Sequence, residues 1–263
     1  MINILEDNVS RSSGKIYFAS DFHLGIPDHA SSRQREEMLV SWLDMIQSDA
    51  SDIFLMGDVF DFWFEYKTVV PKGYIRLLGK LAQLTDQGLK VHLFTGNHDI
   101  WAFSYLQDEA GIELHRKPEV RDMMGKTFYL AHGDGLGPGD NGYKFLKKVF
   151  SCRFNQYLFR WLHPDIGARM GLYFSGKSRL ANMIKEDKAE NLNRIEDEML
   201  YQYATGILQN GTKPDYFIFG HRHRPENIEL PGGSRLIILG DWLTHFTYAE
   251  FDGKQIHLKK FKS

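Results

Sequence analysis

The sequence predicts a layered α/β fold, because short apolar runs alternate with amphipathic helical patterns along its 263 residues. The runs are too short for helices and rich in Ile, Phe, Leu, Tyr and Val, which is typical of strands buried on both faces of a sheet. The runs that follow residue 216 lie close together, so we expect hairpins there. The predicted strands cover residues 15–19, 52–56, 90–94, 127–131, 216–219 and 236–239.

Three stripes of apolar residues at helical spacing predict helices between or after these strands. The first covers residues 38–46 and follows the pair Ser31–Ser32, which suits a helix start. The second covers 75–84 and precedes Gly88, a residue favoured just beyond a helix end. The third covers 192–207.

The composition is that of an ordinary globular protein, with 43% hydrophobic residues and a net charge of −2. The single cysteine, Cys152, excludes an internal disulfide and suits a reducing compartment. No apolar run reaches the length of about 18 residues that a transmembrane helix needs. Residues 1–13 are polar and do not resemble a signal peptide. We therefore expect one cytoplasmic domain over residues 1–263.

Five predicted strands end in clusters of Asp, Asn, His and Gly. In open α/β sheets the carboxyl ends of the strands are where binding sites form. Glycines in the clusters permit tight turns and close approach of the backbone. The clusters read Ser20-Asp21-Phe22-His23, Gly57-Asp58-Val59-Phe60-Asp61, Gly96-Asn97-His98-Asp99, His132-Gly133-Asp134 and Gly220-His221-Arg222-His223.

These clusters contain seven candidate metal ligands: four imidazoles, two carboxylates and one amide oxygen. One ion rarely takes seven protein ligands, whereas two ions that share a bridging carboxylate do. Nitrogen and oxygen ligands without thiolate suit Mn²⁺, Fe or Zn²⁺. The candidates are Asp21, His23, Asp58, Asn97, His132, His221 and His223.

Other polar residues near the predicted strands carry weaker signals. We expect Asp99, Asp134 and Asp241 to be turn residues or supports of the ligands rather than ligands. Five further histidines stand outside any cluster, so we expect them to be caps or surface residues: His29, His92, His115, His163 and His257.

The order of the five clusters resembles the signature of the calcineurin-like metallophosphoesterase superfamily, and it spans Asp21 to His223. The resemblance implies a four-layer α/β/β/α sandwich with a dinuclear centre between the loops of two sheets. It assigns Asp58 as the bridging ligand. It also implies that Asp21, His23 and His223 hold one ion, and that Asn97, His132 and His221 hold the other.

Within that superfamily the chain is similar to the UDP-2,3-diacylglucosamine hydrolases of lipid A biosynthesis. The similar segments are 20–25, 57–63, 132–136, 140–143 and 220–225, together with a helical insertion, or lid, over about 140–210. The resemblance implies cleavage of a lipid-linked sugar nucleotide to 2,3-diacylglucosamine 1-phosphate (lipid X) and UMP, usually with Mn²⁺. Two residues depart from the family pattern: His98 stands where many members have Arg, and Arg222 where Thr is frequent.

Two divalent cations can activate a bridging water and clamp phosphoryl oxygens, so we expect a metal-bound hydroxide to attack phosphorus in line. Asp58 and His98 are the catalytic candidates. His98 follows a candidate ligand and should face the substrate, where it could stabilise charge or protonate the leaving oxygen. Asp61 or Asp99 could orient His98, as carboxylates behind imidazoles often do.

The stretch 143–188 carries ten basic and three acidic side chains, a local charge of +7 that leaves −9 for the rest. Many aromatic residues are interleaved. One interpretation is a helical hairpin with a solvated basic face. The other is a basic aromatic lid that holds acyl chains and touches anionic lipid on the inner face of the inner membrane. The negative remainder argues against nucleic acid as a partner.

Three functions remain open: hydrolysis of the diacylated sugar nucleotide, phosphoesterase action on another nucleotide, phosphodiester or phosphoprotein, and a non-catalytic scaffold that binds anionic lipid. The complete set of ligands argues against the scaffold. An apolar cavity under the insertion would favour the lipid substrate. By resemblance, the candidate substrate contacts are Asn97, His98, Asp140, Asn141, Tyr143, Lys177, Ser178, Asn182 and Lys185.

Overall fold

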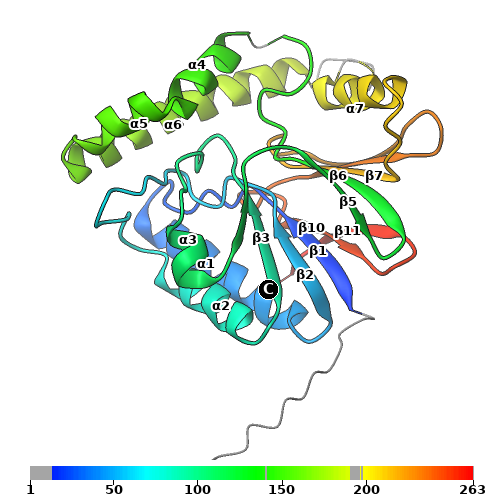
Figure 1. The fold of residues 1–263 in the computed structure, drawn as a ribbon, viewed down its shortest axis with the longest axis horizontal. Coiled ribbons are helices and arrows are strands. Elements are labelled where there is room, and N and C mark those ends of the chain that lie inside the picture. The colour runs from blue at the N-terminus through cyan, green and yellow to red at the C-terminus, as the bar shows by residue number, and fades with distance from the viewer. Residues whose placement is uncertain (1–13, 140, 190–195, 197, 263) are drawn as a thin grey trace, which may run out of the picture.

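Two mixed β-sheets face each other in the protein (Figure 1). The computed structural model describes residues 14–139, 141–189, 196 and 198–262. In the first sheet the order is β11 (Ile256–Lys260), β10 (Thr247–Phe251), β1 (Lys15–Ala19), β2 (Ala50–Leu55), β3 (Lys90–Phe94) and β4 (Glu113–His115). In the second it is β5 (Glu119–Met123), β6 (Lys126–Leu130), β7 (Tyr216–Phe219), β9 (Arg235–Leu239) and β8 (Pro225–Glu229).

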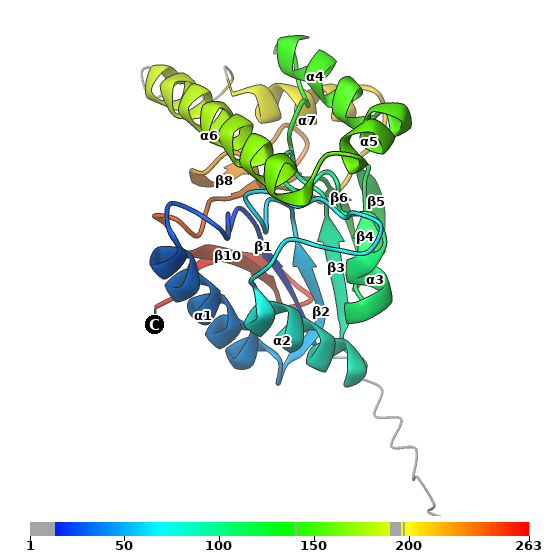
Figure 2. The same ribbon diagram turned by 90° about the vertical axis from the view of Figure 1, so that its left-hand side faces the viewer.

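Helices cover the outer faces of both sheets, which confirms the predicted α/β/β/α sandwich. Helices α1 (His29–Ile46), α2 (Ile75–Asp86) and α3 (Tyr105–Ala110) lie on the first sheet. Helix α7 (Met199–Gln209) packs on the second sheet through Leu200 and Ala204. Three more helices lie across one end of the sandwich (Figure 2): α4 (Asn141–Ser151), α5 (Arg153–Arg160) and α6 (Pro164–Ala189).

The central strands β1, β2 and β3 of the first sheet are largely buried on both faces, as their continuous apolar runs predict. On β1, Tyr17 packs toward the helices, whereas Phe18 points into the space between the sheets. The Phe18 ring stacks on Phe54 of the same sheet, at 5.1 Å between centroids, and on Phe128 of the opposite sheet, at 5.8 Å. Aromatic stacking across this gap therefore joins the two sheets.

Most predicted elements are confirmed, with small shifts of their ends. The strands predicted at 15–19, 90–94 and 216–219 have the observed bounds, and the later strands form the hairpins β8–β9 and β10–β11. The predicted start of the first helix is wrong, because Asp28 caps it by accepting a hydrogen bond from Ser31 N at 2.9 Å. The first part of the stripe 192–207 lies outside the described residues.

The parallel strands determine where the polar clusters meet. Strands β1 to β4 run parallel in the first sheet, as do β6, β7 and β9 in the second. Their carboxyl ends therefore lie at one end of the sandwich, beneath α4, α5 and α6 (Figure 1). In the described part of the chain, no helix combines the length and the apolarity that crossing a bilayer requires.

We expect Phe18→Ala to lower the free energy of unfolding by about 3–5 kcal/mol, because it leaves a cavity between the two sheets. Urea denaturation followed by circular dichroism measures the change. The matched control is Phe154→Ala on the exposed surface of α5, which should change stability by less than about 0.5 kcal/mol. Equal effects of the two substitutions would contradict the role given to Phe18.

Candidate metal centre

Four of the seven candidate ligands have backbone angles in the left-handed region. The φ values are +57° for Asp21, +43° for His23, +51° for Asp58 and +65° for His221. Such conformations cost a non-glycine residue roughly 1–3 kcal/mol and persist only where the surroundings fix them. Here hydrogen bonds between the loops do so, from Asp21 N to Gly57 O at 3.0 Å and from His23 N to Asp58 O at 2.9 Å.

Asp21, His23 and His223 form a first cluster of side chains that could hold a cation. The Nε2 atoms of the two histidines lie 3.2 Å apart. Asp21 Oδ1 lies 3.7 Å from the Nε2 of His23 and 3.5 Å from that of His223. Behind His223, Asp241 Oδ2 faces Nδ1 at 3.8 Å, so Asp241 lies behind the cluster as a support.

Asp58, His132 and His221 form a second cluster next to the first. His132 Nε2 lies 3.3 Å from Asp58 Oδ2. The same Oδ2 atom lies 3.8 Å from His23 Nε2 in the first cluster, so Asp58 stands between the two groups. This position matches that of a bridging carboxylate.

Several ligand atoms are buried without a hydrogen-bond partner among the described residues: Asp21 Oδ1, Asn97 Oδ1 and His132 Nε2. His132 donates from Nδ1 to Met56 O at 2.8 Å, so Nε2 is the ring atom that faces Asp58. A buried polar atom without a partner costs about 1–3 kcal/mol. Cations would satisfy all three atoms, and the mixture of oxygen and imidazole donors fits divalent ions.

Two glycines are required because the polar groups approach the backbone closely. A Cβ atom on Gly96 would lie 2.1 Å from Asp58 Oδ1, and one on Gly57 would lie 2.4 Å from His132 Nδ1. Only a hydrogen atom fits at either position.

The buried carboxylates stabilise positive charge at this site. Burial opposes protonation of His23 and His132, but hydrogen bonds and charges from Asp21, Asp58 and Asp61 outweigh it and raise both pKa values to about 10. Burial likewise opposes ionisation of Asp58, yet the neighbouring histidines hold its pKa well below the usual value. An imidazole must lose its proton to bind a metal, so binding of cations here would release protons.

His98 faces the same space as the candidate ligands. Its Nδ1 donates to Asp61 O at 3.0 Å, and its Nε2 lies 4.0 Å from Asp58 Oδ2. Asp61 thus contacts His98 through its carbonyl group, while its carboxylate lies 3.3 Å from His23 Nδ1. Burial opposes ionisation of Asp61, but His23, His98 and Arg179 lower its pKa to about 2.

Asp99 holds two loops together rather than contacting His98. Its carboxylate accepts hydrogen bonds from Gly96 N at 2.7 Å and from Val59 N at 2.9 Å. Burial and the charge of Asp58 raise its pKa to about 7.

Two partners of the buried carboxylates come from the insertion and were not predicted as site residues. Ser175 donates to Asp61 Oδ2 at 2.5 Å, and Arg179 pairs with Asp61 Oδ1. The spacing of Ser175 and Arg179, four residues apart on α6, places them on one helix face, but nothing in the sequence connects that face to Asp61.

The structure describes only some of the remaining candidate substrate contacts. Tyr143 donates to Asp134 Oδ2 at 2.5 Å, and Asn141 is exposed in the first turn of α4. Lys177 is exposed, with Nζ 4.8 Å from the centroid of the Tyr173 ring. Asp140 lies outside the described residues, and so do the side chains of Ser178, Asn182 and Lys185, whose backbone belongs to α6.

A cavity of about 560 Å³ lies between the insertion and the candidate ligands. Asn97, His98 and Asp61 line its polar end. The rest of its wall is mainly apolar and comes from Phe62, from the loop after β3 and from α4, α5 and α6. This wall includes Trp101, Leu146, Phe150, Phe159, Met170 and Phe174.

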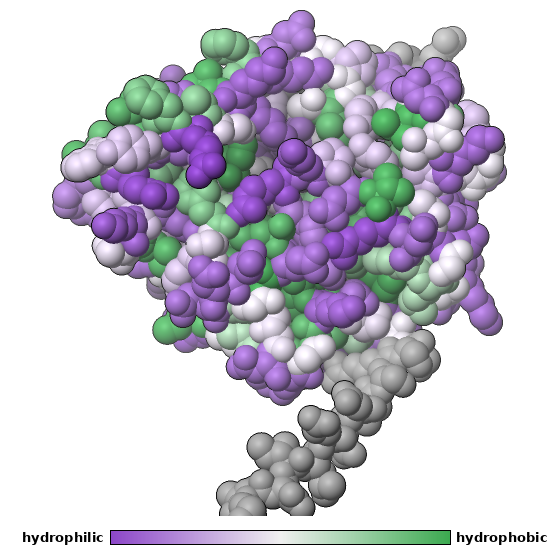
Figure 3. Space-filling model, viewed as in Figure 1, coloured by the Kyte–Doolittle hydropathy of each residue, from purple (hydrophilic) through white to green (hydrophobic). Residues whose placement is uncertain are grey.

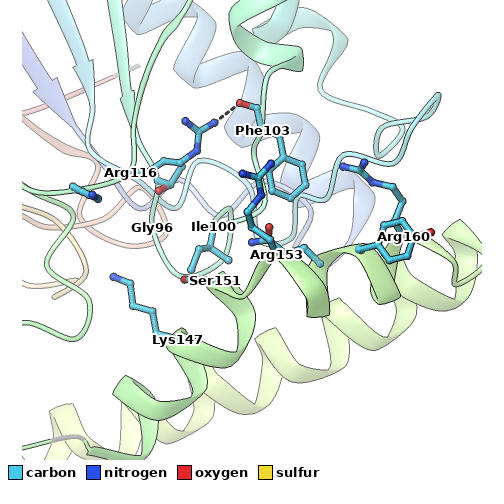
Figure 4. A pocket seen from close by; sticks show the side chains of 12 residues that line it. Gly96, Ile100, Phe103, Arg116, Lys147, Ser151, Arg153 and Arg160 are labelled. Carbon is cyan, nitrogen blue, oxygen red and sulfur yellow. Dashed lines mark hydrogen bonds between the residues drawn. The ribbon is translucent and has the colours of Figure 1, made fainter.

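A second cavity, of about 850 Å³, lies on another side of α4 and α5 (Figure 4). Gly96 and Ile100 form part of its wall, so it borders the loop that carries Asn97 and His98. Five cationic side chains line it: Arg116, Lys117, Lys147, Arg153 and Arg160.

Buried carboxylate, imidazole and amide oxygen ligands at the carboxyl ends of two facing sheets are typical of a metal-dependent phosphoesterase. The chain belongs to the calcineurin-like phosphoesterase family, whose model matches residues 14–225. It is 37% identical to a UDP-2,3-diacylglucosamine hydrolase of Porphyromonas gingivalis, over 94% of this chain and 98% of that protein. It is 24% identical to the enzyme of the same name from Histophilus somni, over 87% and 92% of the two chains.

Among solved structures, the chain is similar to Yfce, a phosphoesterase from E. coli. The two are 16% identical with a TM-score of 0.42, and the match covers 90% of this chain and 87% of the other.

We expect Gly96→Ala to displace Asp58 and to lower both bound metal and phosphoesterase turnover, the latter by about 100-fold, because a displacement near 1 Å has that effect in an active site. Metal content is measured by mass spectrometry of the purified protein. The matched control is Gly206→Ala on α7, where a Cβ meets nothing within 4 Å. Full metal content in Gly96→Ala would contradict the close packing described.

Proposed function

We propose that this protein hydrolyses the pyrophosphate bond of UDP-2,3-diacylglucosamine to give 2,3-diacylglucosamine 1-phosphate and UMP. The observation that carries this proposal is the apolar cavity whose polar end is lined by Asn97 and His98. A substrate with two acyl chains and a pyrophosphate needs an apolar wall for the acyl chains next to metal cations that bind the pyrophosphate. The 37% identity to a UDP-2,3-diacylglucosamine hydrolase over nearly the whole chain supports the same substrate.

The proposed cofactors are two divalent cations, with Mn²⁺ as the expected metal and Fe or Zn²⁺ compatible with the same donors. Asp21, His23 and His223 would hold one ion. Asn97, His132 and His221 would hold the other, and Asp58 would serve both. When bound, such ions activate water and stabilise the charge on phosphoryl oxygens.

His98 is the proposed catalytic group of the chain itself. The hydrogen bond from its Nδ1 to Asp61 O fixes the ring so that Nε2 is free to act, and the side chain lines the apolar cavity. From there it could donate a proton to the leaving oxygen or stabilise its charge. Burial lowers the pKa of His98 against the raising effect of Asp58, which favours the neutral ring at rest. Because Nδ1 holds the single proton of that ring, Nε2 then carries a lone pair, and either role would require the ring protonated on both nitrogens.

Asp61 is the proposed support of this arrangement. It contacts His98 and His23 and pairs with Ser175 and Arg179 of α6. The position of the lid and the orientation of His98 and His23 would therefore both depend on Asp61. Within a single domain of residues 1–263, we propose that the insertion of about 140–210 includes the lid over the substrate.

The insertion also supports a peripheral contact with an anionic membrane on the cytoplasmic side. Phe154 and Trp161 on and just beyond α5 are 66% and 75% exposed. Hydrophobic side chains gather beside hydrophilic ones over these helices (Figure 3), and the basic cavity next to them could take a lipid phosphate. Peripheral proteins usually bind a membrane by burying apolar side chains in the lipid. The attraction of cationic side chains to anionic headgroups adds about 1 kcal/mol for each Lys or Arg.

Turnover of the purified protein tests the proposed substrate. With Mn²⁺ present, we expect UDP-2,3-diacylglucosamine to be hydrolysed to UMP, and p-nitrophenyl phosphate to react much more slowly. Chelation of the metal should abolish both activities, and Asp58→Ala should lower turnover by at least about 1,000-fold because it removes a ligand shared by two cations. Activity on small soluble esters alone would favour a phosphoesterase with another substrate, and no turnover at all would favour a lipid-binding scaffold.

Replacement of His98 tests its assigned role separately from metal binding. We expect His98→Ala to lower kcat by about 10²–10⁴-fold, the usual contribution of a general acid, while the metal content stays that of the unmodified protein. Steady-state kinetics and metal analysis on the same preparation measure both. If His98→Ala retained full kcat, the residue would have no part in the chemistry.

A further inference from the structure

Outside the catalytic centre, His92, Glu113 and His115 come together at one edge of the sandwich. Taken alone, the sequence predicts that both histidines are caps or surface residues. That expectation is wrong: His92 on β3 and His115 on β4 are buried, and the two face each other. We propose that these three residues form a further metal site, of the class that takes Zn²⁺.

The distances between the three ligand atoms fit a tetrahedral ion. His92 Nδ1 lies 3.2 Å from His115 Nε2 and 3.2 Å from Glu113 Oε2. His115 Nε2 lies 3.6 Å from Glu113 Oε1. Zinc bound to nitrogen and oxygen at about 2.0–2.1 Å has ligands roughly 3.3 Å apart when the geometry is tetrahedral. Two His and one Glu leave a fourth position for water.

The outer nitrogen of each imidazole faces a carboxylate, as in most zinc sites with histidine ligands. His115 Nδ1 lies 2.7 Å from Glu119 Oε1 on β5, and His92 Nε2 lies 3.5 Å from Asp52 Oδ1 on β2. Arg121 donates to Glu113 Oε1 at 2.8 Å, which leaves Oε2 facing His92.

These contacts place three acceptors around one point. A neutral imidazole carries a single ring proton. If the Nδ1–H of His115 donates to Glu119 and the Nε2–H of His92 donates to Asp52, both facing nitrogens carry lone pairs, only 3.2 Å apart. Together with Glu113, they require a positive charge between them. Glu113 is the exposed side of the cluster, which gives an ion a path from solvent.

The site would strengthen the edge of the sandwich next to the catalytic loop. Its ligands come from β3 and β4 of the first sheet, whereas Glu119 and Arg121 belong to β5 of the second. His115 O also accepts a hydrogen bond from Thr95 N at 2.9 Å, two residues before Asn97. An ion on His92 and His115 would therefore fix the start of the loop that presents Asn97 and His98.

Zinc stoichiometry in a protein without the catalytic centre tests the proposal. The background is the triple variant His23→Ala, Asp58→Ala, His221→Ala, which removes a ligand from each of the two clusters. It is loaded with Zn²⁺, desalted and analysed by mass spectrometry. We expect one tightly bound Zn²⁺ per chain, lost on adding Glu113→Gln, an exposed change that should leave the fold intact by circular dichroism. Adding His257→Gln, a surface histidine on β11, is the matched control and should leave the ion in place.

Two further measurements locate the ion. Anomalous diffraction at the zinc edge should give a peak between His92 and His115, and Glu119→Gln should weaken Zn²⁺ binding by about 10–100-fold. No bound Zn²⁺ in the background variant, or an ion unaffected by Glu113→Gln, would overturn the proposal in favour of a shared proton. Neither result depends on turnover, so the test is independent of the proposed substrate.

Discussion

The ionised carboxylate of Asp58 is the constraint on which the rest of the site depends. It is buried at the junction of two sheets, where an unpaired charge would be expensive. His132 and His23 contact its side chain, and His98 N donates to its Oδ1 at 2.9 Å. Each of these residues comes from a different loop. The loops can therefore hold their positions only while positive charge, from protons or from cations, surrounds this one group.

The strained backbone around Asp58 follows from the same requirement. Four ligand side chains must turn inward immediately after their strands, and the left-handed conformation achieves this turn within one residue. Gly57 and Gly96 leave the space that His132 and Asp58 fill. A site of this kind uses the stability of the two packed sheets to maintain unfavourable local geometry, which is the usual relation between a scaffold and an active site.

The parts that could be predicted from sequence are those with a local signal. Continuous apolar runs identified the central strands, and the polar clusters at their ends identified the candidate ligands. The edge strands β4 and β5 were missed because one is three residues long and the other has no apolar run. The pairing of His92 with His115 and that of Asp61 with Arg179 were also missed. Both join residues far apart in the chain, and only the folded sheets bring them together.

The insertion is attached to the core by carboxylates that belong to the catalytic loops. Asp61, three residues after Asp58, pairs with Ser175 and Arg179, whereas Asp134, two residues after His132, pairs with Tyr143 and Lys147 at 2.5 and 2.7 Å. Part of the excess positive charge of the insertion therefore forms ion pairs with carboxylates in the negatively charged rest of the chain. Since the same loops carry the candidate ligands, any movement of the lid must change the charges that surround the metal centre.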